Sequence, residues 1–186
     1  MTNTIAPSTV RVLPQDRSSR VITVIILLLA YSATVQYVVG PALESLVAQN
    51  AQNNQFNDTA TLLTVMRVGV VFWVFLVSFL QALSLRLIYK GIVRGPAPSL
   101  GTSWCWALAG QLPFILTGLS LMLLADGRGI GALGHMGLRI VFGAAAAAIY
   151  CALARYAFRP SGARLTIYFF VVTVVNSVLL VAVAAS

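Results

Sequence analysis

The chain has 186 residues, of which 59% are hydrophobic and only 9% are charged. A soluble domain carries about 25% charged residues, so this composition excludes an ordinary soluble protein and predicts a membrane protein. The net charge of +8 is spread in small groups at the ends of apolar runs, a pattern that sets membrane topology and does not form a nucleic-acid-binding face.

Because one spanning helix takes about 20 apolar residues, the chain has room for five or six spans and none for a separate soluble domain. Residues 1–20 are polar and basic, and we expect a disordered cytoplasmic arm there. Residues 21–186 are then a single transmembrane domain. Its first span is predicted over residues 21–39, a run of 19 residues that exceeds the apolar core of a signal peptide, about 7 to 15 residues.

Gly40 and Pro41 are expected to end or kink that helix, because proline lacks an amide hydrogen and clashes with the preceding turn. Residues 42–61 contain two acids and no Lys or Arg, which predicts a polar loop outside the cell. Within it, Leu43 and Leu46 are spaced as on one helix face and predict a short amphipathic helix on the membrane surface.

The second span is predicted over residues 68–85, between Arg67 and Arg86. These two arginines would lie about 28 Å apart on a helix, close to the hydrocarbon thickness of about 30 Å. Both side chains can therefore extend to opposite interfaces. At the helix start, Asp58 or the residue before it is a candidate cap.

A basic loop rich in Gly and Pro follows the second span. Lys90 and Arg94 enter this loop, and we expect them to contact anionic lipids or a protein partner at the cytoplasmic face. Trp104 and Trp106 then begin the third span, where an amphipathic indole ring is most stable at the membrane interface.

The third span is predicted to continue to about residue 125 with a kink near its middle. Pro113 removes one backbone hydrogen bond and frees the carbonyl group of Ala109. Gln111 lies beside this point, and its amide could satisfy a freed backbone group.

The fourth span, residues 140–154, is short. Only 15 residues separate Arg139 from Arg155, so either the bilayer thins or Arg139 lies below the interface. His135 and Arg139 are four residues apart and would share a helix face, either as a functional pair or as groups that extend to the outer interface.

Small residues dominate this fourth span. Gly143 and Ala147 are four residues apart, a spacing that lets helix backbones approach closely. We therefore expect the span to lie centrally in the bundle or to contact another subunit.

The fifth span is predicted over residues 165–185, with Asn176 at its middle. An amide at membrane depth needs a hydrogen-bond partner on another helix, and Gln36, Gln81 and Gln111 are the candidates.

Five spans with a cytoplasmic N-terminus place nine Lys and Arg residues inside and three outside, and the C-terminus outside. The three outer residues are Arg67, Arg128 and Arg139. The expected fold is thus an all-α bundle of five transmembrane helices.

The chain has no motif of a known catalytic or metal site. Its four acids lie in loops or at span ends, it has one His, and Cys105 and Cys151 have no second ligand at metal-binding spacing. We expect no enzyme activity and no cofactor, and we interpret both cysteines as buried apolar groups.

The stretch from Tyr89 to Leu116 resembles the Ypt-interacting-protein (Yip) family of small five-span membrane proteins. In that family a basic, Gly-containing loop is followed by an aromatic-led span with a proline near its middle. The matching residues are Lys90, Gly91, Gly95, Trp104 and Pro113. The resemblance implies a non-enzymatic role, associated with export machineries and envelope stress in bacteria and with small GTPases in eukaryotes.

Three functions follow as hypotheses. The first is an accessory protein of a bacterial plasma membrane that binds other membrane proteins, for example beside an ABC exporter or as an immunity-type subunit. The second is a solute-binding subunit of a transporter, with a pocket among the intramembrane glutamines, Trp104 and Asn176. The third is a small structural subunit of a respiratory or photosynthetic complex. The bacterial location is inferred from a composition rich in Ala and Arg and poor in Lys.

Overall fold

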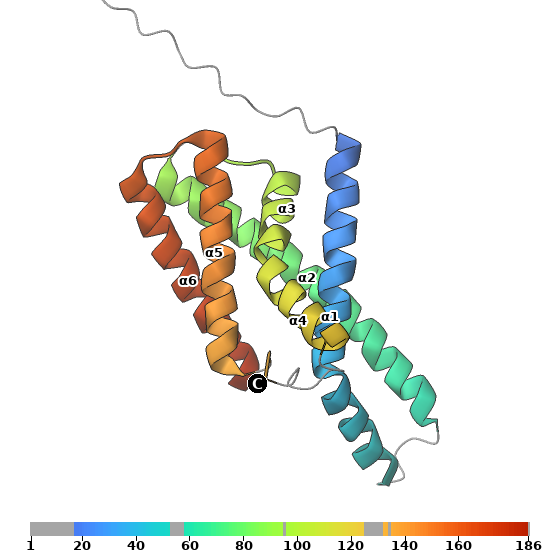
Figure 1. Ribbon diagram of the computed structural model, residues 1–186. Coiled ribbons are helices and arrows are strands. Elements are labelled where there is room, and N and C mark those ends of the chain that lie inside the picture. Colours follow the sequence, from blue (N-terminus) through green and yellow to red (C-terminus); the bar gives the residue numbers. More distant parts are fainter. Residues whose placement is uncertain (1–16, 53–57, 95, 125–131, 134, 186) are drawn as a thin grey trace, which may run out of the picture.

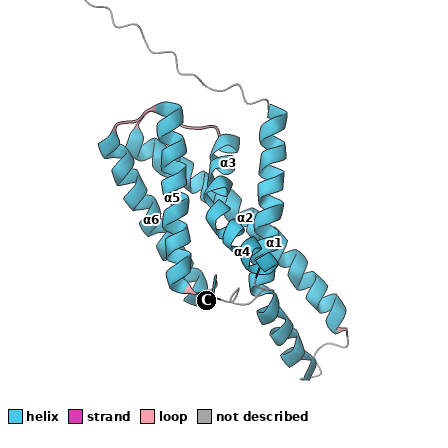
Figure 2. Cartoon of the chain, viewed as in Figure 1, coloured by secondary structure: helices cyan, strands magenta, loops and turns pink. Residues whose placement is uncertain are grey.

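The computed structural model describes the chain except residues 1–16, 53–57, 95, 125–131, 134 and 186. The described residues form α-helices and no strand (Figure 2). The helices are α1 (Arg17–Gln52), α2 (Thr59–Val93), α3 (Leu100–Gly110), α4 (Leu112–Leu124), α5 (Met136–Phe158) and α6 (Gly162–Ala185).

Successive helices run in opposite directions, except that α3 continues into α4 in the same direction as one bent pair (Figure 1). The starts of α1, α3 and α6 lie at one end of the bundle together with the last turns of α2 and α5. The helix α6 ends at the opposite end. The helix α3 is central, since it contacts α1, α2, α4 and α5.

Three described helices, α1, α2 and α5, are long and apolar enough to cross a membrane. The pair α3 and α4 counts as a fourth if it is one bent span. In α6 the apolar stretch among the described side chains is Gly162–Val175, which is shorter. The prediction of an all-α membrane protein is confirmed, with three or four candidate spans among the described residues.

The distribution of side chains also fits a membrane. Large apolar residues such as Ile26, Phe72 and Leu123 are exposed, whereas small polar residues such as Thr34 and Ser103 are buried. Water-soluble proteins place these classes the other way round. In a bilayer, small and hydroxyl-bearing residues between helices allow close packing and hydrogen bonding.

The first loop is where the structure differs most from the sequence prediction. Gly40 and Pro41 do not end the first helix, which continues to Gln52, although its lower part is tilted relative to its upper part in Figure 1. The predicted polar loop 42–61 and its separate surface helix are therefore wrong. An interior proline costs about 3 kcal/mol, and packing of this part of α1 against α2 offsets that cost.

The predicted kink in the third span is confirmed. α3 and α4 meet at Gln111 with a bend of 41°. The backbone N–H of Gln111 donates to the carbonyl of Leu108 at 2.9 Å, which closes the last turn of α3. Pro113 falls in the first turn of α4, where a missing amide hydrogen costs little.

Two glycines let helices cross at short distance. A Cβ atom on Gly110 of α3 would lie 3.0 Å from the carbonyl oxygen of Ala146 on α5. A Cβ on Gly118 of α4 would collide with the methyl group of Thr34 on α1. These two crossings hold the bent pair between α1 and α5.

The fourth predicted span is longer than expected. α5 has 23 residues and begins at Met136, so a helix of about 34 Å is available where the sequence indicated 15 residues. Arg139 lies in its first turn and Arg155 in its last turn, so the helix extends beyond the apolar run at both ends. The last four residues of the predicted disordered arm belong to α1, which begins at Arg17, and the rest of the arm lies outside the described residues.

Candidate interaction surfaces

Three tyrosines form the centre of the packed core. Tyr89, Tyr150 and Tyr168 come from α2, α5 and α6, and each has 0% of its surface exposed. The rings of Tyr89 and Tyr168 lie 5.4 Å apart, and those of Tyr150 and Tyr168 lie 6.0 Å apart. The first contact is edge to face and the second is tilted, and aromatic pairs at such distances add to the stabilisation from burial alone.

Hydrogen bonds connect this core to neighbouring helices. The hydroxyl groups of Ser103 and Tyr150 lie 2.7 Å apart, and the Ser103 hydroxyl donates to the carbonyl of Ala82 at 3.0 Å. Tyr168 donates to the carbonyl of Leu85 at 3.1 Å. The polar groups at this depth therefore join α2, α3, α5 and α6.

Both predicted interfacial tryptophans pack partly inside the bundle. The indole nitrogen of Trp104 donates to the hydroxyl of Ser78 at 3.2 Å, and its ring meets Phe75 and Phe79 edge to face. Trp106 packs edge to face on Tyr150 at 5.6 Å. Their placement indicates a role in helix packing in addition to any contact with lipid.

Two of the predicted intramembrane amides come together. The side-chain nitrogen of Gln111 lies 3.5 Å from the side-chain oxygen of Gln81, at the bend between α3 and α4. The amide of Gln36 instead donates to the backbone carbonyl of Arg67 at 3.3 Å. The side chain of Asn176 lies outside the described part. The described glutamines thus do not line one shared pocket.

The small residues of α5 face helices of the same chain. Ala147 is 1% exposed and belongs to the buried core, and Ala146 meets Gly110 of α3. Gly143 is half-buried. The close approach at Ala146 is thus made to another helix of the same chain.

His135 and Arg139 lie at the start of α5. His135 is exposed and occupies the N-cap position without a side-chain cap bond, and Arg139 is half-buried. The backbone N–H of Arg139 donates to the carbonyl of His135 at 3.1 Å. Their side chains are not hydrogen-bonded to each other, so this pair stays a prediction.

One end of the bundle is strongly basic, and we call it the basic end. It comprises Arg20, Arg86, Lys90, Arg94, Arg155, Arg159 and Arg164, at the starts of α1 and α6 and the last two turns or C-caps of α2 and α5 (Figure 1). The described carboxylates, Glu44 and Asp58, are at the other end. This charge asymmetry agrees with the predicted topology.

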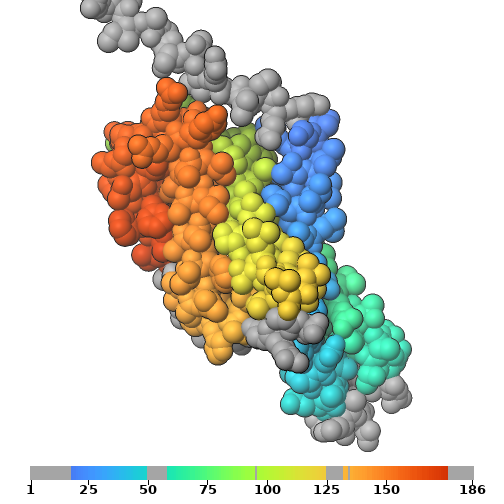
Figure 3. Space-filling model, viewed as in Figure 1, coloured from blue at the N-terminus to red at the C-terminus, as the bar shows by residue number. Residues whose placement is uncertain are grey.

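At the other end, α1 and α2 extend beyond the remaining helices as a pair (Figures 1 and 3). We call residues 40–52 and 59–67 the projecting hairpin. Its helices are joined by an ion pair of 3.1 Å between Arg67 and Glu44, whose side chains are both about half exposed. Exposed pairs contribute little stability, so the hairpin depends on packing between its helices.

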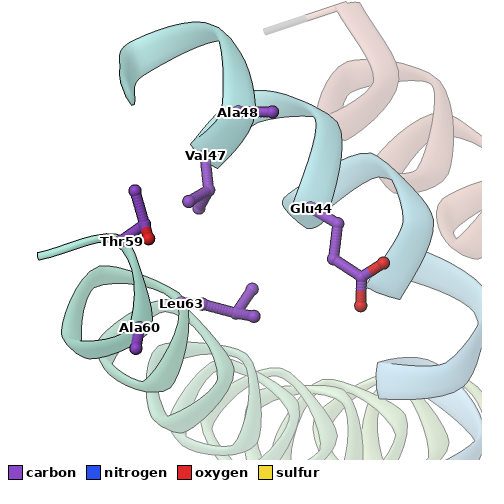
Figure 4. A pocket seen from close by; sticks show the side chains of 6 residues that line it. All are labelled: Glu44, Val47, Ala48, Thr59, Ala60 and Leu63. Carbon is purple, nitrogen blue, oxygen red and sulfur yellow. The ribbon is translucent and has the colours of Figure 1, made fainter. Parts of the chain in front are cut away.

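The tip of the projecting hairpin carries a shallow hollow of about 270 Å³. The side chains of Val47 and Leu63 point into it from the two helices, and the carboxylate of Glu44 lies at one side (Figure 4). Val47 is 6% exposed, whereas Leu46 beside it is 46% exposed. The tip therefore presents both a small core and an uncovered apolar residue.

Asp58 caps the start of α2, as predicted. Its carboxylate accepts hydrogen bonds from the hydroxyl and the backbone N–H of Thr61. These bonds, the hydroxyl first, hold the pKa of Asp58 below its ordinary value. The cap therefore contributes at neutral pH, and its contribution is lost as the pH falls through that lowered pKa.

The sequence prediction missed the tyrosine core and two unusual caps. The helices α2 and α5 end at Arg94 and Arg159, whose φ angles are 52° and 46°. Glycine is the residue usually found in this left-handed conformation. Tyrosines 18 to 79 residues apart in sequence carry no periodic signal, and an arginine at a cap looks like any other basic loop residue.

Among the described residues, no group of three or more His, Cys, Asp or Glu side chains is placed to hold a metal ion. Comparison of the chain with protein-family models, curated proteins and solved structures gives no match.

Proposed function

We propose that the protein is a non-enzymatic integral membrane protein that acts by binding other membrane proteins. In this proposal the chain crosses the membrane five times, with its N-terminus and basic end in the cytoplasm and its C-terminus outside. The alternating helix directions and the charge asymmetry support this topology (Figure 1). The resemblance to the Yip family and the role beside an exporter remain predictions.

The projecting hairpin is the observation that carries the proposal. α1 has 36 residues and α2 has 35, so each is more than about 50 Å long, against a hydrocarbon thickness of about 30 Å. The excess lies at the end opposite the basic end, where the pair stands clear of the other helices (Figure 3). A helical pair outside the membrane is accessible to other proteins.

Apolar side chains on the projecting hairpin strengthen this interpretation. Leu46 is 46% exposed and Val65 is 62% exposed, and both belong to the projecting hairpin. Inside a bilayer such residues face lipid, but outside it they face water. Burial of uncovered apolar surface against a partner is favourable.

Copurification with a matched pair of variants tests the proposal. Leu46→Glu places a charge on the exposed apolar position, and Gln49→Glu places the same charge on an exposed polar position of the same helix. In mild detergent we expect the tagged wild type and Gln49→Glu to retain the same partner in equal amounts. Leu46→Glu should retain about tenfold less of this partner, because burying a charge at a contact is costly. Equal recovery with both variants, or no reproducible partner for the wild type, would contradict the proposal.

A further inference from the structure

We propose that the corner where α2 and α5 end and α6 begins binds the phosphate groups of anionic phospholipids through Lys90, Arg94 and Arg159. This inference rests on the proposed function only in placing the basic end at a membrane surface.

The backbone at two of these residues is the first observation. Arg94 and Arg159 are the non-glycine residues with positive φ in the described chain, and each caps a helix C-terminus at the same end of the bundle. Glycine adopts this conformation without steric cost, whereas an L-residue with a side chain does so at a cost. We therefore infer that the arginine side chains at both positions have a binding role that offsets this conformational cost.

The second observation is that the corner is assembled by a bond between distant segments. The guanidinium of Arg164, in the first turn of α6, donates to the carbonyl of Val93 at 2.9 Å. This bond brings the start of α6 to the end of α2, beside Arg94. Arg159 lies only three residues before α6 begins, so all three arginines belong to one corner.

The third observation is the state of the side chains there. Lys90, Arg94 and Arg159 are exposed, and in the described part of the chain their side chains form no hydrogen bond or ion pair. The described carboxylates lie at the far end of the bundle, so within the described part of the chain the positive charges of the corner repel one another. An external anion relieves this repulsion.

The position of the corner selects the anion. It lies at one end of the apolar helices, which in the proposed topology is the level at which lipid headgroups begin. Phosphate groups of anionic lipids are concentrated at that level, and each Lys or Arg near such a surface raises affinity about fivefold. An arginine also binds phosphate through two parallel hydrogen bonds, which gives specific geometry.

Replacing both capping arginines by glycine separates binding from structure. The double variant Arg94→Gly/Arg159→Gly removes two charges but keeps, and relaxes, the left-handed caps. In lipid-free neutral detergent we expect it to melt several degrees above the wild type. Native mass spectrometry with phosphatidylglycerol should show an affinity about 25-fold lower, with binding of phosphatidylcholine unchanged.

Two controls sharpen the result. Arg94→Lys/Arg159→Lys keeps the charge and should retain most phosphatidylglycerol binding, and Arg139→Gln at the opposite end should retain all of it. Inorganic phosphate at millimolar concentration should not displace the lipid. A glycine variant that keeps full phosphatidylglycerol affinity, or that melts below the wild type, overturns the inference, as does displacement by free phosphate. The assay uses purified protein without a partner, so its failure is distinct from failure of the copurification test.

Discussion

Replacing Gly110 with leucine is expected to destabilise the folded bundle by about 3 kcal/mol or more, near the upper end of the range for overpacking a core. A Cβ atom at this position would lie 3.0 Å from the carbonyl oxygen and 3.1 Å from the Cα of Ala146. Both atoms belong to the backbone of α5, so neither can rotate away. The remaining side chain would force α3 and α5 apart.

Gly101 provides a matched control on the same helix. A Cβ at Gly101 has no atom within 4 Å, so Gly101→Leu should leave stability within about 0.5 kcal/mol or raise it through better helix propensity. Unfolding in mixed micelles with increasing sodium dodecyl sulfate, followed by tryptophan fluorescence, measures both variants. Equal midpoints for the two leucine variants would show that the α3–α5 crossing is not as close as described.

Replacing Ser103 with alanine is expected to cost about 1 to 3 kcal/mol, although it removes a single oxygen atom. The Ser103 hydroxyl is fully buried, donates to the carbonyl of Ala82 and bonds to the hydroxyl of Tyr150. Without it, the Tyr150 hydroxyl remains in the core with fewer partners. The penalty for leaving a buried polar group unsatisfied exceeds the net value of the bond.

Tyr89→Phe is the control for this prediction. The Tyr89 hydroxyl is buried and has no hydrogen-bond partner in the described structure, so its removal should leave stability unchanged or slightly higher. The same unfolding assay compares the two variants. A larger loss for Tyr89→Phe than for Ser103→Ala would mean that the hydrogen-bond network of the core is assigned wrongly.

Much of the fold could be predicted from composition and local pattern. The helices α2, α5 and α6 contain the predicted apolar runs, because a bilayer requires long uninterrupted apolar helices. The bend at Gln111 was predictable because Pro113 acts on the chain locally. The basic end was also predictable, since each of its residues follows or precedes an apolar run.

The errors arise where tertiary contacts override local preference. Pro41 and the polar residues after it predict a loop, yet α1 stays helical to Gln52, because this part of it packs against α2. Local sequence carries no information about that partner helix. Residue type alone likewise does not say which helix face turns inward, so the sequence could not predict that Gln111 meets Gln81 while Gln36 bonds to the backbone of Arg67.

Accessibility of single cysteines in intact cells tests the central claim, which is that the projecting hairpin and the basic end lie on opposite sides of the membrane. Cys105 and Cys151 are first replaced by alanine, and Ala48→Cys or Lys90→Cys is then introduced at an exposed position. We predict that a membrane-impermeant maleimide labels Ala48→Cys in intact cells and Lys90→Cys only after permeabilisation. Labelling of Lys90→Cys in intact cells, or labelling of both positions from one side, would contradict the account.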